Sequence, residues 1–194
     1  MTDRRLLGLI TLFAAALRFS TLDAQSFEYD EAFTVMLVEM DLRDMLSTIP
    51  DTEATPPLYY VIAWAWSQLF GSGEIGLRVL SALLGTALVP LAYRAAGELV
   101  TRQVGLAVAA LLAVNPYMIW MAQEARSYAL LLVLSTASLL FFVRVLDDRG
   151  SRPLLWWTVV SALALATHYF AVFMIATQGA WLLLRVARRP AWRS

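Results

Sequence analysis

The sequence predicts an all-α polytopic membrane protein with about six transmembrane helices and with juxtamembrane interfacial helices in a long first outer loop. Hydrophobic residues make up 60% of the 194 residues, charged residues make up 15%, and the mean hydropathy is +0.64. These values are far from those of a soluble domain. Five apolar stretches approach the roughly 20 residues that a helix needs to cross a bilayer. In addition, the fifteen basic residues, all of them arginine, are spread unevenly over the connections between these stretches.

The predicted membrane spans are residues 6–22, 77–96, 104–122, 127–143 and 153–184. A single helix over the last stretch would be about 48 Å long at about 1.5 Å per residue, whereas the hydrocarbon core is about 30 Å thick. We therefore expect two helices there, with a turn at His168 and Tyr169. This gives six crossings in total.

The arginines orient these spans, because positively charged residues favour cytoplasmic connections. With the N-terminus in the cytoplasm, three arginines lie outside: Arg43, Arg78 and Arg126. Eleven then lie inside: Arg4, Arg5, Arg94, Arg102, Arg144, Arg149, Arg152, Arg185, Arg188, Arg189 and Arg193. A single final span would move the last four of them outside. Both termini are therefore expected in the cytoplasm.

The first outer loop differs in composition from every other connection. Residues 23–76 hold ten of the fifteen acidic residues. Within this loop, residues 58–70 are apolar but too few for a span, and a span there would leave four arginines inside against ten outside. We interpret them as an interfacial helix, with Trp64 and Trp66 at the headgroup level. The expected organisation is a first span up to residue 22, the loop at 23–76, five further spans over 77–185, and a cytoplasmic tail at 186–194.

Arg18 interrupts the first apolar stretch and argues against a cleaved signal sequence. We expect its side chain to snorkel to the outer interface, with the lining of a polar cavity as the alternative. The chain has no cysteine, so neither a disulfide framework nor a thiolate metal site is expected.

Candidate chemical groups occur in three of the predicted outer connections. Asp30 and Glu31, in FEYDEA, open a stretch that predicts one or two short surface helices, and the structural alternative for Asp30 is a helix N-cap. Glu124 and Arg126, in MAQEARSY, lie at a membrane boundary, where the alternative is an interfacial Glu–Arg pair. His168 is the single histidine. It forms no recognisable metal motif with the scattered acids, and a capped or snorkelled side chain is the alternative.

Five ordered motifs carry a family resemblance: YDEAFT, TPPLYY, GLRVLSALLG, NPYMIWMAQEARSYALL and ALATHYF. The chain resembles the bacterial relatives of the protein mannosyltransferases, in family 39 of the GT-C glycosyltransferase superfamily. That group also includes the aminoarabinose transferases that modify lipid A. The resemblance covers nearly the whole chain. Because family members are usually longer, the chain is similar to their N-terminal portion.

The resemblance implies a glycosyltransferase of the bacterial inner membrane whose active face lies outside. Its donor would be a polyprenyl-phosphate sugar and its acceptor a lipid, glycan or protein. Asp30 matches the catalytic aspartate of the family and Glu31 its neighbour. The positions that match substrate-binding residues of the family are Pro57, Tyr59, Arg78, Glu124, Arg126, His168 and Tyr169.

The residue types suit this chemistry. Asp30 could take the proton of the acceptor in a single inverting displacement, while Arg126, with Arg78 as a second candidate, holds the donor phosphate. Asp30 and Glu124 are candidate ligands of a divalent cation such as Mg²⁺ or Mn²⁺. The alternative is a non-catalytic membrane protein, either a truncated scaffold subunit or a small transporter with polar groups near the bilayer midplane. Membrane lipids are expected partners and nucleic acid is not.

Overall fold

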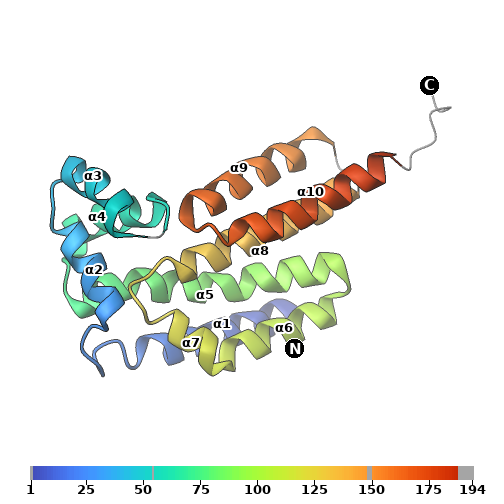
Figure 1. Cartoon of the computed structure of the whole chain (residues 1–194). Coiled ribbons are helices and arrows are strands. Elements are labelled where there is room, and N and C mark those ends of the chain that lie inside the picture. Colours follow the sequence, from blue (N-terminus) through green and yellow to red (C-terminus); the bar gives the residue numbers. More distant parts are fainter. Residues whose placement is uncertain (1, 54, 148–149, 188–194) are drawn as a thin grey trace.

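The computed structural model describes residues 2–53, 55–147 and 150–187 (Figure 1). These residues form ten α-helices: α1 (Asp3–Phe19), α2 (Tyr29–Val38), α3 (Leu42–Thr52), α4 (Leu58–Phe70), α5 (Glu74–Leu99), α6 (Arg102–Val114), α7 (Pro116–Met121), α8 (Tyr128–Leu146), α9 (Ser151–Thr167) and α10 (Ala171–Ala187). The all-α class is confirmed. Arg149, Arg188, Arg189 and Arg193, with most of the expected tail at 186–194, lie outside the described residues.

Two of these helices are long and apolar enough to cross a membrane, α5 with 26 residues and α8 with 19. Helix α5 contains the predicted span at 77–96, and α8 contains all but the first residue of the span at 127–143. Helices α1, α9 and α10 have 17 residues each, and α6 has 13. The number of six crossings therefore stays a prediction.

Helix α5 is the centre of the fold, with contacts to α1, α4, α6, α7 and α8 (Figure 1). Helices α8 and α9 form an antiparallel hairpin, and α10 packs against both. Helices α2, α3 and α4 gather at one end of the molecule, together with the segment between α7 and α8 and the turn between α9 and α10 (Figure 1). The start of α1, the α5–α6 connection and the end of α10 lie toward the other end. The predicted outer segments are thus next to one another in space.

The predicted span at 104–122 is not one helix but two, because the chain breaks at Asn115 and Pro116. Asn115 has an extended backbone and caps α7, with its Oδ1 accepting the N–H of Met118 at 3.1 Å. Pro116 has no N–H, so the carbonyl of Leu112, four residues earlier, lacks its helical donor. The break leaves carbonyl groups at the end of α6 that need other partners.

Arg18 supplies those partners, so the expectation that it snorkels to the interface is wrong. Its side chain is 0% exposed, and Nη2 donates to the carbonyl of Leu112 at 2.9 Å. Nη1 donates to the carbonyl of Ala113 at 3.3 Å. A cation is also favourable at a helix C-terminus. Gly85 allows this close packing, since a Cβ there would lie 2.4 Å from the Cβ of Ala122.

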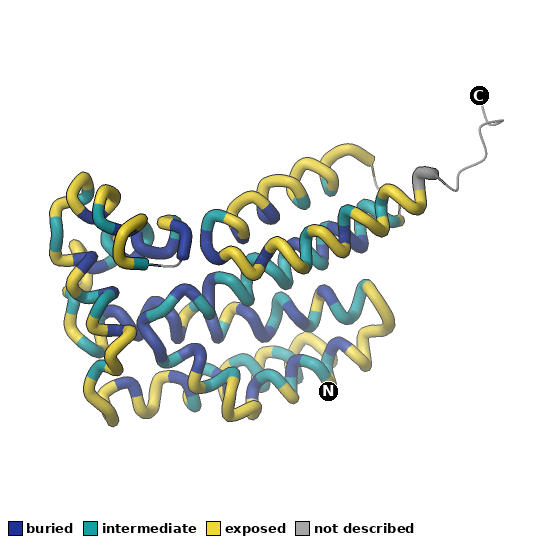
Figure 2. The backbone as a smooth tube through the Cα atoms, in the orientation of Figure 1, coloured by how far each residue is buried: buried dark blue, intermediate teal, exposed yellow. Residues whose placement is uncertain are grey.

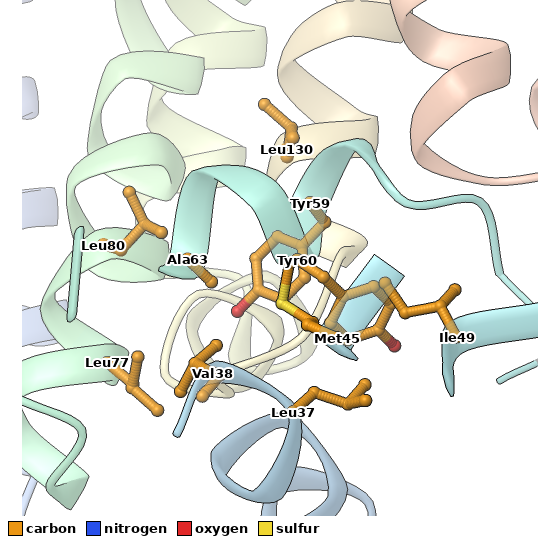
Figure 3. Packing of buried hydrophobic residues seen from close by; sticks show 11 residues of the cluster. Leu37, Val38, Met45, Ile49, Tyr59, Tyr60, Ala63, Leu77, Leu80 and Leu130 are labelled. Atoms are coloured by element: carbon orange, nitrogen blue, oxygen red, sulfur yellow. The ribbon is translucent and has the colours of Figure 1, made fainter. Parts of the chain in front are cut away.

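A buried cluster fixes the three short helices to the end of α5 (Figure 3). Leu37 and Val38 of α2, Met45 and Ile49 of α3, Tyr59, Tyr60 and Ala63 of α4, and Leu77 and Leu80 of α5 belong to it. Two tryptophan N–H groups of α4 add to this attachment. Trp64 Nε1 donates to the carbonyl of Met40 at 3.0 Å, and Trp66 Nε1 donates to that of Gly76 at 2.8 Å.

Exposed residues dominate much of α9 and α10, whereas buried residues concentrate along α5 and α4 (Figure 2). Many of the exposed side chains are large and apolar, among them Leu12, Phe13, Leu155, Trp156, Phe173, Trp181 and Leu183. An apolar surface of this extent suits a hydrocarbon environment.

Candidate functional site

The N-cap residue of helix α2 is not Asp30, which was the structural alternative for that residue. Glu28 is the N-cap residue, and Glu31 reaches back so that its Oε2 accepts the Glu28 N–H at 3.0 Å. This is the reciprocal pattern of a capping box. Asp30 therefore lies in the first turn and is not the N-cap. Its exposed carboxylate accepts no hydrogen bond from the described part of the chain.

Glu31 and Arg78 form a buried bidentate ion pair between α2 and α5. Arg78 Nε donates to Glu31 Oε1 at 2.9 Å, and Arg78 Nη2 donates to Oε2 at 2.6 Å. The remaining N–H groups of Arg78 donate to the carbonyls of Leu22, Gln25 and Ser26. All five N–H donors of this guanidinium are therefore used within the protein.

Glu31 is as fully bonded as its partner. Its Oε1 also accepts the N–H of Ala125 at 2.8 Å, which joins the α7–α8 segment to the pair. Burial by itself would raise the pKa of Glu31, but the hydrogen bonds from Arg78, Ala125 and Glu28 outweigh it and hold that pKa below its ordinary value. Glu31 is thus ionised and joins α2, α5 and the α7–α8 segment. Both of its carboxylate oxygens are fully used by hydrogen bonds within the protein.

Arg126 contrasts with Arg78. Its Nη1 donates to the backbone carbonyl of Asp30 at 3.0 Å and to Glu53 Oε1 at 3.3 Å. Its Nε is buried without a hydrogen-bond partner, and its Nη2 makes no hydrogen bond to any residue that the structure describes. Two neighbouring donors of the guanidinium, Nε and Nη2, are therefore unused within the described residues, and the surrounding protein covers Nε. The expected alternative pair with Glu124 is wrong, because the ion-pair partner is Glu53.

Asp30 and Arg126 line a common cavity of about 530 Å³, which we name the Asp30 cavity. Glu28, Glu31 and Glu124 also line it. Its other walls are mostly apolar and aromatic: Tyr117, Met118, Trp120, Met121, Tyr128, Leu131, Leu132 and Phe170. A mostly apolar cavity with a few convergent polar groups is typical of a ligand site.

A second cavity, of about 310 Å³, adjoins the first, and we name it the Gln123 cavity. Both cavities share the lining residues Glu28, Glu31, Trp120 and Glu124. The Gln123 cavity adds Thr21, Ala24, Gln25, Arg78 and Gln123. Arg78 thus belongs to this cavity, while Arg126 belongs to the other.

Glu124 lies between the two cavities and is only 8% exposed. Burial, together with the nearby carboxylates of Glu28 and Glu31, raises its pKa to about 7, against the opposing charge of Arg126. A carboxyl group with this pKa can exchange a proton near neutral pH.

His168 lies close to the Asp30 cavity without lining it. Its Nδ1 accepts the N–H of Phe170 at 3.2 Å within the turn between α9 and α10, and its ring lies 6.1 Å from that of Tyr128. Burial, and then the charge of Arg126, lower the pKa of His168. Tyr169 is exposed.

The two predicted site residues near the start of α4 do not line either cavity. Tyr59 is fully buried in the cluster of Figure 3, and Pro57 is the exposed N-cap residue of the helix. Asp30 and Glu124 line the same cavity, but the described residues contain no group of three or more His, Asp or Glu side chains placed to hold a metal ion.

Sequence reasoning missed two residues that shape the site. Glu53 positions Arg126, although 73 residues separate them. Gln123 Nε2 donates to the carbonyls of Leu17 and Arg18 and to Thr21 Oγ1, so it caps the end of α1. Its position beside Glu124 in MAQEARSY was the available signal.

Comparison with protein families finds a match over residues 54–194 to the dolichyl-phosphate-mannose-protein mannosyltransferase family. The match covers Arg78, Glu124, Arg126 and His168, and it begins after α2. Neither the curated proteins nor the solved structures contain a match to this chain. The matched region includes α5 and α8, the two helices long and apolar enough to cross a membrane. The chain therefore belongs to the dolichyl-phosphate-mannose-protein mannosyltransferase family, as a membrane glycosyltransferase of the GT-C type.

Proposed function

We propose that this chain transfers a sugar from a polyprenyl-phosphate donor to a lipid, glycan or protein acceptor on the outer side of a bacterial inner membrane. Asp30 acts as the general base, and Arg126 binds the donor phosphate. The chain crosses the membrane six times in this proposal, and α2, α3 and α4 lie at the outer face. The alternative of a non-catalytic scaffold or small transporter is an outcome of the test below.

One observation carries the proposal: Asp30 and Arg126 line the same cavity, and each has bonding capacity to spare. The Asp30 carboxylate is exposed, and Arg126 presents an unpaired Nε beside an unbonded Nη2. Glu31 and Arg78, the other acid and base of the predicted set, use their oxygens and N–H groups on each other and on the backbone. Asp30 and Arg126 are therefore the better pair for chemistry.

The proposed reaction is a single displacement at C1 of the sugar. An acceptor hydroxyl or amine forms a bond to C1 while its proton moves to Asp30, and the bond between C1 and the phosphate oxygen breaks on the opposite face. The configuration at C1 is inverted. The phosphate leaves with an additional negative charge, which the unused donors of Arg126 stabilise through charge-assisted hydrogen bonds.

The experiment measures transfer from radiolabelled polyprenyl-phosphate sugars in membranes that contain the wild-type chain, Asp30→Asn or Asp44→Asn. Asp44, which is exposed on α3 away from both cavities, is the matched control. Loss of a positioned general base lowers the rate by about 10²–10⁴-fold, so Asp30→Asn should lose transfer and Asp44→Asn should keep it. Equal transfer by both variants would contradict the role of Asp30. No transfer by the correctly inserted wild type would favour the non-catalytic alternative.

A further inference from the structure

We infer that the Gln123 cavity is a binding site for an organic ammonium group, held between Glu124, Glu28 and the ring of Trp120. This goes beyond the proposed transfer chemistry, because Asp30 does not line the cavity and binding requires no reaction. Four features of the cavity support it: an unpartnered buried acid, an excess of hydrogen-bond acceptors, a saturated arginine and an aromatic wall.

Glu124 is the first feature. Its side chain is more than nine-tenths buried, and neither carboxylate oxygen accepts a hydrogen bond from the residues that the structure describes. A carboxylate on a largely buried side chain that accepts no hydrogen bond from the protein has unused acceptors, and a ligand that donates hydrogen bonds or carries positive charge satisfies them. Because Glu124 lines the cavity wall, a ligand can reach it.

The other polar groups of the cavity also favour a ligand that donates hydrogen bonds. Gln123 uses its amide nitrogen for Leu17, Arg18 and Thr21, which leaves the amide oxygen as its available group. Glu28 adds a second carboxylate that acts on the charge of Glu124. The cavity therefore offers mainly acceptors.

Arg78 does not reverse this preference. Its charge is paired with Glu31, and its five N–H groups are all used, so it has no donor for an anionic ligand. With three carboxylates and one arginine on the wall, an anionic group such as a phosphate is disfavoured here. The arginine with unused donors, Arg126, lines the Asp30 cavity.

Trp120 completes the site. Trp120 lines both cavities, and a tryptophan face attracts an alkylammonium group through the ring quadrupole. A ring and carboxylates together distinguish an ammonium group from a hydroxyl of similar size, because the hydroxyl gains neither the charge pairing nor the full cation–π attraction.

The test uses the purified full chain in lipid nanodiscs and measures n-butylammonium against n-butanol by saturation-transfer NMR at pH 8. Glu124, whose pKa is raised to about 7, is mostly ionised there. We expect the ammonium to bind at least about tenfold tighter than the alcohol, because a hydrogen bond to a charged group contributes more than a neutral one. Glu124→Gln should remove that preference. Equal binding of the two probes, or a preference unchanged in Glu124→Gln, would overturn the inference.

Additional measurements control for misfolding of the variant and distinguish an amino sugar from a simple amine as the ligand. If Glu124→Gln does not fold, as judged by circular dichroism, Trp120→Leu and Glu28→Gln provide the same comparison from other lining residues. 6-Amino-6-deoxyglucose, compared with glucose, asks whether the amine is recognised on a sugar. Tighter binding than n-butylammonium assigns the site to an amino sugar, and equal binding assigns it to a bare amine. Asp30→Asn should keep ammonium binding while it loses transfer, so the two proposals can fail separately.

Discussion

Arg78 and Glu31 share two hydrogen bonds, of 2.9 and 2.6 Å, across the interface between α5 and α2. Both side chains are buried, and the same arginine holds the carbonyls of Leu22, Gln25 and Ser26. This pair fixes the segment that presents Asp30. We expect Glu31→Ala to lower the free energy of unfolding by about 3–5 kcal/mol, since it leaves a buried guanidinium unpaired. Thermal unfolding of the purified protein in detergent measures the change.

A double variant tests whether Glu31 and Arg78 stabilise the protein as a pair. In Glu31→Ala with Arg78→Met, no unpaired charge remains, so the combined loss of stability should be smaller than the sum of the two single losses. Additive losses would show that the two side chains do not act as a pair.

Arg126 should bind the donor phosphate through its forked edge, and Arg126→Lys tests the geometry. Lysine keeps the charge but cannot donate two parallel hydrogen bonds. We expect the KM for the donor to rise by about tenfold, because one charge-assisted hydrogen bond is lost. Steady-state transfer at varied donor concentration measures it, and Arg43→Lys, on the exposed surface of α3, is the control. An unchanged KM would remove Arg126 from the donor site.

Glu53 should act as a positioning residue for Arg126. Its Oε1 lies 3.3 Å from Arg126 Nη1, and both side chains are largely buried. Glu53→Gln keeps the size and shape of the side chain but removes its charge, which weakens its interaction with the Arg126 guanidinium. Small displacements of a positioned group cost up to about 10²-fold in rate. We expect transfer to fall while the protein stays folded, as judged by circular dichroism. Recovery in Glu53→Asp would support a positional role, and full activity of Glu53→Gln would exclude it.

Sequence reasoning succeeded where the length of an apolar stretch decides the structure. The bounds of α4 agree with the predicted helix at 58–70, α5 contains the span at 77–96, and α8 contains all but the first residue of the span at 127–143. The break at Asn115 and Pro116 had a local signal, but the apolar run around it favoured one span. The partner of Arg126 had no local signal. Glu53 is brought to it by the packing of α3 against α2 and of α2 against α4, and charge spacing along the chain does not encode such a contact.

The same limit applies to Asp30 and Glu31. Apart from the family resemblance, nothing in FEYDEA distinguishes the environments of its adjacent acids Asp30 and Glu31. Yet Asp30 is exposed in a cavity, and Glu31 is buried with hydrogen bonds from Arg78, Ala125 and Glu28. Successive helical positions point about 100° apart, so only the direction of α2 separates their roles. That direction depends on the pair with Arg78, which lies 47 residues away.

Glu124 should make stability depend on pH. Its pKa is about 7 in the folded protein, against 4.5 as the ordinary value, so the folded state binds more protons between these values. Its contribution to stability is complete below pH 4.5 and is lost as the pH rises through 7. We expect the Tm of the wild type, relative to that of Glu124→Gln, to fall from pH 5 to pH 8. Parallel Tm curves for the two proteins would show that Glu124 is not perturbed.

Arg18 and Pro116 should be energetically coupled although they lie on different helices. Arg18 donates to the carbonyl of Leu112, which lacks its helical donor because Pro116 has no N–H. Arg18→Met should therefore destabilise the protein, since it leaves that carbonyl unsatisfied as well as removing packing. Pro116→Ala restores an N–H four residues after Leu112.

The double variant decides whether this explanation of the break is correct. With Pro116→Ala present, the carbonyl of Leu112 has a second donor, so Arg18→Met should cost about 1 kcal/mol less than it does in the wild type. Unfolding of the four proteins in the same detergent gives this coupling energy directly. A coupling near zero would mean that Arg18 is held by the helix C-terminus as a whole, through the carbonyls of Ala113 and Ala14, and not by the missing N–H of Pro116.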